Sequence, residues 1–203
     1  MTKRLLHNAQ VIDPEAGTIT RADIRIENGL ITQVSQSPLS ANPNEHSVDC
    51  HNKYLAPGII DIGVKVCEPG ERHKESFKSA GLAAAAGGIT TMVTRPDTTP
   101  AIDSPETLEF IARRANQATP VNVIPMAALT KGRNGREMSE IGFLMDAGAI
   151  AFTDCDHVVS NPKVFARALS YACALGALVI AHPQEPTLSK GCLLYTSPSP
   201  RDA

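Results

Sequence analysis

The spacing of hydrophobic and polar positions changes near Pro57, and this change divides the chain into two parts. Before Pro57, short apolar segments alternate with polar residues and turn signals, which is typical of antiparallel strands. After it, apolar stretches of strand length alternate with longer stretches of helical period, which indicates parallel strands joined by helices. The pattern therefore predicts a small N-terminal β-domain over residues 1–56 and an α/β domain from residue 57.

The N-terminal part contains one strong turn signal, the pair Asn28-Gly29 between the apolar segments 24–27 and 30–34. The central positions of a type I′ turn require a positive φ, which both residues tolerate, so we predict a two-residue hairpin here. Residues 35–46 are polar and contain proline, and we expect them to form a loop. A segment of this length is too short to build a complete core by itself.

The α/β part is predicted to contain five strands and four helices. The strands are expected at 59–66, 89–94, 121–127, 149–153 and 178–182. The helices are expected at 75–87, 105–117, 137–147 and 162–175. A closed (β/α)₈ barrel takes roughly 250 residues, so we predict the first part of such a barrel over residues 57–190.

Several of these helix boundaries have a specific chemical signal. Ser104-Pro105 and Asn161-Pro162 each place a capping side chain before a proline at the first helical position. Gly148 and Gly176 follow two of the helices and are expected to end them. Residues 191–203 have no helical period, and we expect a non-native or disordered tail there.

Composition excludes several classes of function. The 203 residues carry a formal net charge of −2, which does not favour nucleic acid or an anionic membrane surface as a partner. No apolar run reaches the roughly 18 residues of a spanning helix, and the N-terminus does not resemble a signal peptide. The five cysteines have no paired spacing, which is typical of free thiols in a cytoplasmic protein.

Four motifs follow one another in the chain: Pro-Gly-Ile-Ile-Asp at 57–61, Glu-Pro-Gly at 68–70, His-Lys-Glu-Ser at 73–76 and the segment 83–91. Together they resemble the dihydroorotases of the amidohydrolase superfamily, and the resemblance extends over about residues 3–190. The resemblance implies a partial TIM barrel of about five strands, preceded by a portion of a small β-sandwich. It also implies an origin in pyrimidine biosynthesis, where active members close or open dihydroorotate with the help of zinc.

The catalytic motif of that family is missing from the first barrel strand. Where the family reads His-x-His-x-Arg, this chain has Gly63, Lys65 and Cys67. Glycine offers no ligand, and a lysine ammonium repels a metal ion, so we predict no catalytic residue on this strand. One hypothesis is that the Lys65 ammonium takes the place of the metal and balances Asp61, and a simpler one is that Lys65 reaches the barrel rim.

The ends of the later predicted strands keep only some of the family's substrate-binding and metal-binding residues. Asp97 stands where the family has an asparagine that holds the substrate, and Cys155 stands where we place the carboxylate that bridges two metals. By resemblance, Asp154 and His182 are the remnants of the metal site. Each also has a simpler interpretation: Asp97 as a turn residue, Asp154 as an acceptor of backbone hydrogen bonds, and His182 as a hydrogen-bonded residue at a strand end.

Because the chain resembles this family but lacks its His-x-His-x-Arg motif, we predict a catalytically inactive homologue with no metal cofactor. It implies a structural partner of aspartate carbamoyltransferase, and we expect an oligomer. The alternative is an active, zinc-dependent cyclic amidohydrolase with a rebuilt site that would use His182 and Asp154 together with ligands from the missing half of the barrel, with Cys67 or Cys155 as a further candidate ligand. Bound zinc distinguishes the two hypotheses.

Overall fold

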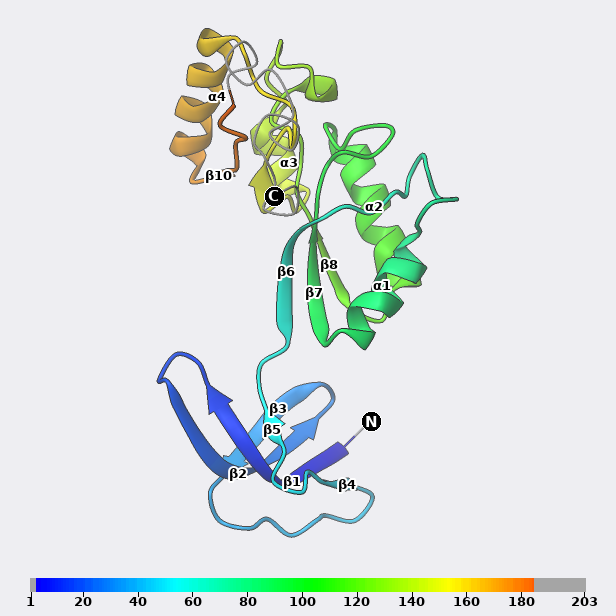
Figure 1. Cartoon of the computed structure of the whole chain (residues 1–203), viewed down its shortest axis with the longest axis vertical. Helices are drawn as coiled ribbons and strands as arrows, with labels where there is room; N and C mark the ends of the chain where they lie inside the picture. Colours follow the sequence, from blue (N-terminus) through cyan, green and yellow to red (C-terminus); the bar gives the residue numbers. More distant parts are fainter. Residues whose placement is uncertain (1–2, 185–203) are drawn as a thin grey trace, which may run out of the picture. The chain divides into compact units, whose positions relative to one another are not determined.

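The computed structural model describes residues 3–184 and separates into two compact units between Gly58 and Ile59 (Figure 1). The sequence pattern predicts a boundary at residue 57. Residues 191–203, predicted as a non-native or disordered tail, lie outside the described residues. Within the described range, none of the helices is long and apolar enough to cross a membrane.

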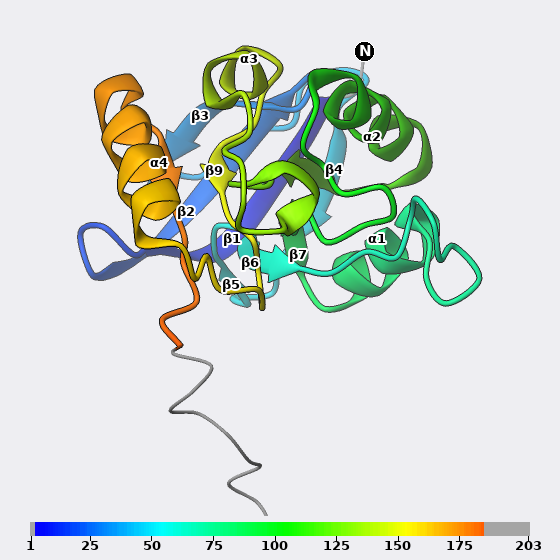
Figure 2. The same cartoon turned by 90° about the horizontal axis from the view of Figure 1, so that it is seen from above.

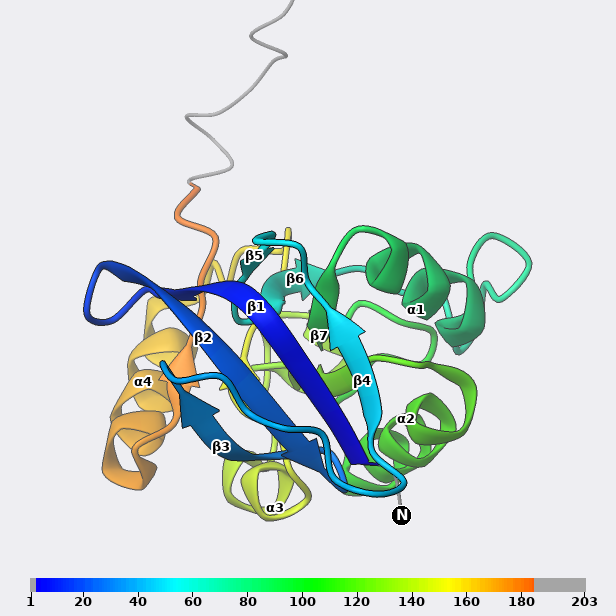
Figure 3. The ribbon, with the colours of Figure 1, turned by 90° about the horizontal axis from the view of Figure 1, so that it is seen from below.

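The N-terminal unit is a single mixed β-sheet (Figure 3). Its strands are β1 (Lys3–Asp13), β2 (Thr18–Glu27), β3 (Leu30–Ser35), β4 (His46–Asp49) and β5 (Tyr54–Leu55). They lie in the order β3-β2-β1-β4, and the short β5 also pairs with β1. The meander β1-β2-β3 is antiparallel, whereas β4 and β5 run parallel to β1.

Local chemistry accounts for the turns of this sheet. Asn28 and Gly29 have φ values of 52° and 83°, which confirms the predicted hairpin between β2 and β3. The Asp23 carboxylate is buried, and it accepts hydrogen bonds from the backbone N–H of Asn8 (2.9 Å) and of Leu39 (2.8 Å). Asp23 therefore stabilises both the irregularity in β1 and the chain that follows β3.

The C-terminal unit has the alternating order that the sequence predicts. Its elements are β6 (Ile59–Val64), α1 (Phe77–Ala86), β7 (Ile89–Thr94), α2 (Pro105–Ala118), β8 (Asn122–Pro125), η1 (Lys131–Arg133), α3 (Ile141–Asp146), β9 (Ala151–Phe152), α4 (Pro162–Leu175) and β10 (Leu178–Val179). Parallel pairing joins β6-β7-β8 and β9-β10, and a parallel bridge between Ala127 and Phe152 connects the two groups. The α/β fold of a partial barrel is therefore confirmed, with the helices on the outside of the strands (Figure 2).

The core lies between these strands and the helices. On α2, the buried residues Leu108, Ile111 and Ala115 follow helical spacing and point toward the sheet. A second, smaller cluster contains Val93, which follows the core residue Met92 on β7 and so points to the opposite face. Burial on both faces is therefore seen at the end of β7, whereas Ile59, Ile60 and Ile62 of β6 are exposed. Each large side chain removed from water contributes about 1.5–3 kcal/mol.

The predicted capping residues act as expected. The Ser104 hydroxyl accepts a hydrogen bond from the N–H of Thr107, and the Asn161 side chain accepts from the second and third residues of α4. Gly176 ends α4 with a φ of 69°, and Gly148 has a φ of 104° just after α3. These contacts set the boundaries of α2 and α4 at the predicted positions.

Some elements are shorter than predicted. The helix predicted at 137–147 begins at Ile141, because Ser139 Oγ instead donates hydrogen bonds to the carbonyls of Ala128 and Leu129. The strands predicted at 121–127, 149–153 and 178–182 shorten to β8, β9 and β10. Backbone hydrogen bonds still continue past their ends, as from Ile180 N to Phe152 O (2.9 Å).

The Glu68-Pro69-Gly70 motif has a structural function. Glu68 Oε2 accepts from the N–H of Phe77 at the start of α1 (2.9 Å), and Oε1 accepts from Arg114 Nε on α2 (2.8 Å). Burial alone would raise the pKa of Glu68, but the bonds from Arg114 and Phe77 outweigh it and hold the pKa below its usual range. At Gly70, where φ is 100°, a Cβ would lie 2.5 Å from the Thr99 carbonyl oxygen.

Candidate functional site

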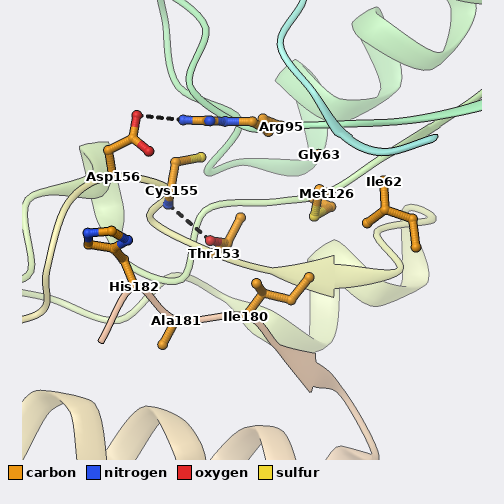
Figure 4. Close-up of a pocket in the computed structure, with 10 residues that line it drawn as sticks. All are labelled: Ile62, Gly63, Arg95, Met126, Thr153, Cys155, Asp156, Ile180, Ala181 and His182. Atoms are coloured by element: carbon orange, nitrogen blue, oxygen red, sulfur yellow. Dashed lines mark hydrogen bonds and ion pairs between the residues drawn. The ribbon is translucent and has the colours of Figure 1, made fainter. Parts of the chain in front are cut away.

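The loops at the C-terminal ends of the barrel strands enclose a cavity of about 250 Å³ (Figure 4). This end of a parallel barrel is where active sites of the fold lie. Its polar lining comes from Arg95 after β7, from the loop after β9 and from His182 after β10. The full lining is Ile62, Gly63, Arg95, Met126, Thr153, Cys155, Asp156, Ile180, Ala181 and His182.

Four charged side chains form a continuous chain of ion pairs beside this cavity. Lys65 Nζ lies 3.0 Å from Asp97 Oδ2, and Arg95 Nη2 lies 3.1 Å from the same oxygen. Arg95 Nη2 also lies 2.8 Å from Asp156 Oδ2 (Figure 4). The charges alternate in sign and sum to zero across the four residues. The chain links the ends of β6 and β7 to the loop after β9.

These contacts perturb the titration of the groups involved. Burial alone would lower the pKa of Arg95, but the hydrogen bond to Asp156 and the nearby Asp97 raise it above its usual range. The same hydrogen bond lowers the pKa of Asp156, and the charge of Arg95 adds to this effect. Both residues are therefore held in their charged forms at neutral pH.

The ion-pair chain corrects two expectations from the sequence. Lys65 pairs with Asp97, so the hypothesis that it balances Asp61 is wrong. Asp97 is not a simple turn residue, since its side chain is 4% exposed and stands between two cations. Sequence reasoning missed Arg95 and Asp156 as members of this site. The available signal was an arginine two residues before the strand-end aspartate.

Asp154 and His182, the predicted remnants of the metal site, line a second cavity of about 200 Å³. Both carboxylate oxygens of the buried Asp154 are engaged by Thr130, which donates its N–H (3.0 Å) and its hydroxyl (2.5 Å). His182 Nε2 lies 2.7 Å from Gln184 Oε1. The structure thus brings the two residues to a common cavity and gives each a hydrogen-bond partner within the protein.

Among the described residues at this end of the strands, Gly63, Lys65 and Cys155 do not fit a zinc ion. Gly63 has no side chain, and Lys65 brings a positive charge. Burial raises the pKa of the Cys155 thiol, whereas zinc binds the thiolate. Within residues 3–184, no group of three or more His, Cys, Asp or Glu side chains is arranged to hold a metal ion.

Solved structures define the class of fold. The chain is similar to the L-hydantoinase (dihydropyrimidinase) from Arthrobacter aurescens, with a TM-score of 0.79 and 21% identity. That match covers 92% of this chain and 42% of the hydantoinase. A crystal structure of a dihydroorotase gives a TM-score of 0.60 at 12% identity, and covers 92% of this chain and 52% of that one. The fold is therefore the one that these two structures share.

Sequence comparison then identifies the family. Residues 52–197 match the model of the family described as dihydro-orotase-like, and the chain belongs to that family. The dihydroorotase of Trichlorobacter lovleyi is 35% identical over 181 residues, which are 89% of this chain and 42% of that protein. The dihydroorotase of Geobacillus thermodenitrificans is 37% identical over 177 residues, covering 87% of this chain and 41% of the relative. The chain spans less than half the length of these relatives.

Proposed function

We propose that this chain comes from a catalytically inactive, dihydroorotase-like protein of pyrimidine biosynthesis. The observation that supports this most directly is the ion-pair chain of Lys65, Asp97, Arg95 and Asp156 at the C-terminal ends of the strands. A metal-dependent hydrolase needs free carboxylates, imidazoles or thiolates there to hold the metal that activates water. Here Asp97 and Asp156 are neutralised by Lys65 and Arg95, and Asp154 is held by Thr130.

Electrostatics opposes zinc binding beside this chain of ion pairs. Two unit charges about 4 Å apart interact by roughly 4 kcal/mol at the effective dielectric near a protein surface, and a divalent ion doubles that value. A zinc ion next to Asp97 would face the charges of both Lys65 and Arg95. The attraction of Asp97 does not offset the repulsion of these two cations, and Asp156, which pairs with Arg95, brings the net charge of the four residues only to zero, so we propose that this site binds no zinc.

The proposed role is structural, as a partner of aspartate carbamoyltransferase within an oligomer. This step rests on the family resemblance. It is supported by the contrast between the site and the scaffold, since the retained motif residue Glu68 still joins α1 and α2 through Phe77 and Arg114. We propose that a fold kept without the ligands of the metal serves assembly.

A specific observation also supports the alternative, an active cyclic amidohydrolase with a rebuilt zinc site. Asp154 and His182 line one cavity, and Cys155 and His182 line the neighbouring one. If the Thr130 hydroxyl and the Gln184 side chain moved, Asp154 Oδ2 and His182 Nε2 would become available to bind zinc. Zinc held in this way would polarise an amide carbonyl and supply hydroxide, as in other hydrolases of this type.

Metal content and turnover distinguish the two proposals. Protein that contains the whole of this sequence would be purified without chelator, and its zinc would be measured together with dihydroorotate hydrolysis and synthesis. We expect neither zinc nor turnover in a folded sample. Near-stoichiometric zinc with turnover would replace this proposal by the rebuilt site.

The structural role needs a separate experiment. The protein would be co-expressed with the aspartate carbamoyltransferase of the same organism and the pair analysed by size-exclusion chromatography with light scattering. We expect a stable complex that survives at physiological salt. A folded protein that elutes apart from the enzyme at micromolar concentration would overturn the proposed partnership.

A further inference from the structure

A polar groove lies between the loop that contains η1 and the loop that connects β9 to α4. It is lined by Arg133, Asn134, Asp156, His157, Val158, Ser160 and Gln184. It differs from the cavity at the strand ends, although Asp156 borders both. Four of its side chains, those of Arg133, Asn134, Ser160 and Gln184, carry guanidinium, amide or hydroxyl groups, which are the donors that recognise oxyanions.

Arg133 is held in position by contacts on both its backbone and its side chain. Its φ is 57°, a left-handed conformation that non-glycine residues rarely adopt. Its N–H donates to the Thr130 carbonyl (2.9 Å), and its Nε donates to the Asp154 carbonyl (3.3 Å). Thr130 is in turn fixed by the buried Asp154 carboxylate. The guanidinium is therefore preorganised, and among residues 3–184 its two terminal nitrogens have no hydrogen-bond partner.

His157 fixes the other side of the groove. Its Nδ1 lies 3.0 Å from the Arg133 carbonyl oxygen, which can only accept, so Nδ1 carries the proton. This contact ties the loop after β9 to the loop that contains η1. His157 Nε2, on the other side of the ring, takes no part in this contact. The exposed Asn134 and Ser160 line the same groove.

The charge of Arg133 is not neutralised by an ion pair within residues 3–184. The neighbouring Lys131 pairs with Glu137 at 2.5 Å, and Asp156 pairs with Arg95 at 2.8 Å. Asp156 lowers the net positive charge of the groove, which favours a small anion with few charges over a highly charged one. Arg136, on the same loop, is exposed and does not line the groove.

We infer that this groove is a binding site for a small oxyanion, such as a phosphate or carboxylate group, held by Arg133 together with Asn134 and Ser160. The proposed ligand contacts use none of the side chains at the predicted metal positions, although the Asp154 carbonyl helps to position Arg133, so the site does not depend on the proposed loss of catalysis. A groove of this kind would recognise an anionic metabolite or an anionic side chain of a partner by the same contacts.

Inorganic phosphate is the probe for this inference, with acetate as the carboxylate probe. Binding to the folded protein would be followed by amide chemical shifts at constant ionic strength. We expect saturable binding with a Kd of about 1 mM. Arg133→Met should weaken binding about tenfold, as expected for a lost charge-assisted hydrogen bond. The matched variant Arg136→Met should bind as the unchanged protein does. Both variants would first be checked for unchanged thermal unfolding.

Three outcomes would overturn the site: absence of saturable binding to the unchanged protein, equal weakening by both variants, or shifts confined to residues outside the groove. Saturation by phosphate alone would assign the site to phosphate groups, and saturation by acetate alone would assign it to carboxylates. None of these results depends on zinc content, so the failure of this inference and of the proposed function are separable.

Discussion

Replacing Arg95 by methionine tests whether the ion-pair chain stabilises the strand ends. The substitution keeps most of the aliphatic volume and removes the guanidinium that joins Asp97 to Asp156. Asp97 is 4% exposed, and it would then have Lys65, which is 51% exposed, as its remaining ion-pair partner. The prediction is a loss of folding stability that arises mainly at the Asp97 end of the chain.

The magnitude follows from the burial of each partner. Breaking a fully buried pair costs about 3–5 kcal/mol, whereas an exposed pair contributes roughly 0–1 kcal/mol. The Arg95 side chain is 23% exposed and that of Asp156 is 75% exposed, so the Asp156 contact belongs to the second class. With Lys65 still in place, we expect a loss of about 2–3 kcal/mol for Arg95→Met.

Urea and thermal unfolding followed by circular dichroism would measure this loss, and a double-mutant cycle would assign it. At about 2–4 °C per kcal/mol for a domain of this size, the midpoint should fall by roughly 4–12 °C. Asp97→Asn alone should also destabilise, and the double variant should lose at least about 1 kcal/mol less than the sum of the single variants. Additive losses, or a loss below about 0.5 kcal/mol for Arg95→Met, would refute the reasoning.

Two further predictions concern buried carboxylates. The pKa of Glu68 is lower in the folded protein than its usual value of 4.5, so its stabilisation is present above that value and is lost as pH falls through the folded pKa. Unfolding midpoints measured from pH 6 downward should show this loss, and Glu68→Gln should reduce the slope; an unchanged slope would contradict it. Asp154→Ala should destabilise by roughly 2–4 kcal/mol, because it leaves the Thr130 N–H and hydroxyl buried without their acceptor. Thr130→Val, which keeps the N–H bond, should cost less by the same unfolding assay, and equal costs would show that the hydroxyl bond dominates.

Predictions from local chemistry were the most accurate. The change in hydrophobic period near Pro57, the turn at Asn28-Gly29 and the caps Ser104 and Asn161 each depend on residues a few positions apart. Helix starts and two-residue turns are satisfied within one segment of chain, so the sequence contains the information needed to place them. The predicted helix at 137–147 was too long because Ser139 is bonded to residues ten positions away.

The role of Asp154 shows what a motif leaves open. By resemblance it belonged to a metal site, and the same residue could equally accept backbone hydrogen bonds. Its actual partner, Thr130, lies 24 positions earlier, in the loop after the neighbouring strand. Sequence spacing does not state which of two neighbouring loops approaches a strand end, because loop conformation depends on packing around it.

The sequence by itself determined the α/β class, the order of strands and helices, the family and the loss of the His-x-His ligands at Gly63 and Lys65. These follow from periodicity and from the identity of residues at motif positions. Tertiary structure alone decided that Lys65, Asp97, Arg95 and Asp156 neutralise one another, since Arg95 and Asp156 are 61 positions apart. Charges from separate strand ends meet only after the parallel strands have assembled, because pairing brings their carboxyl ends to one edge.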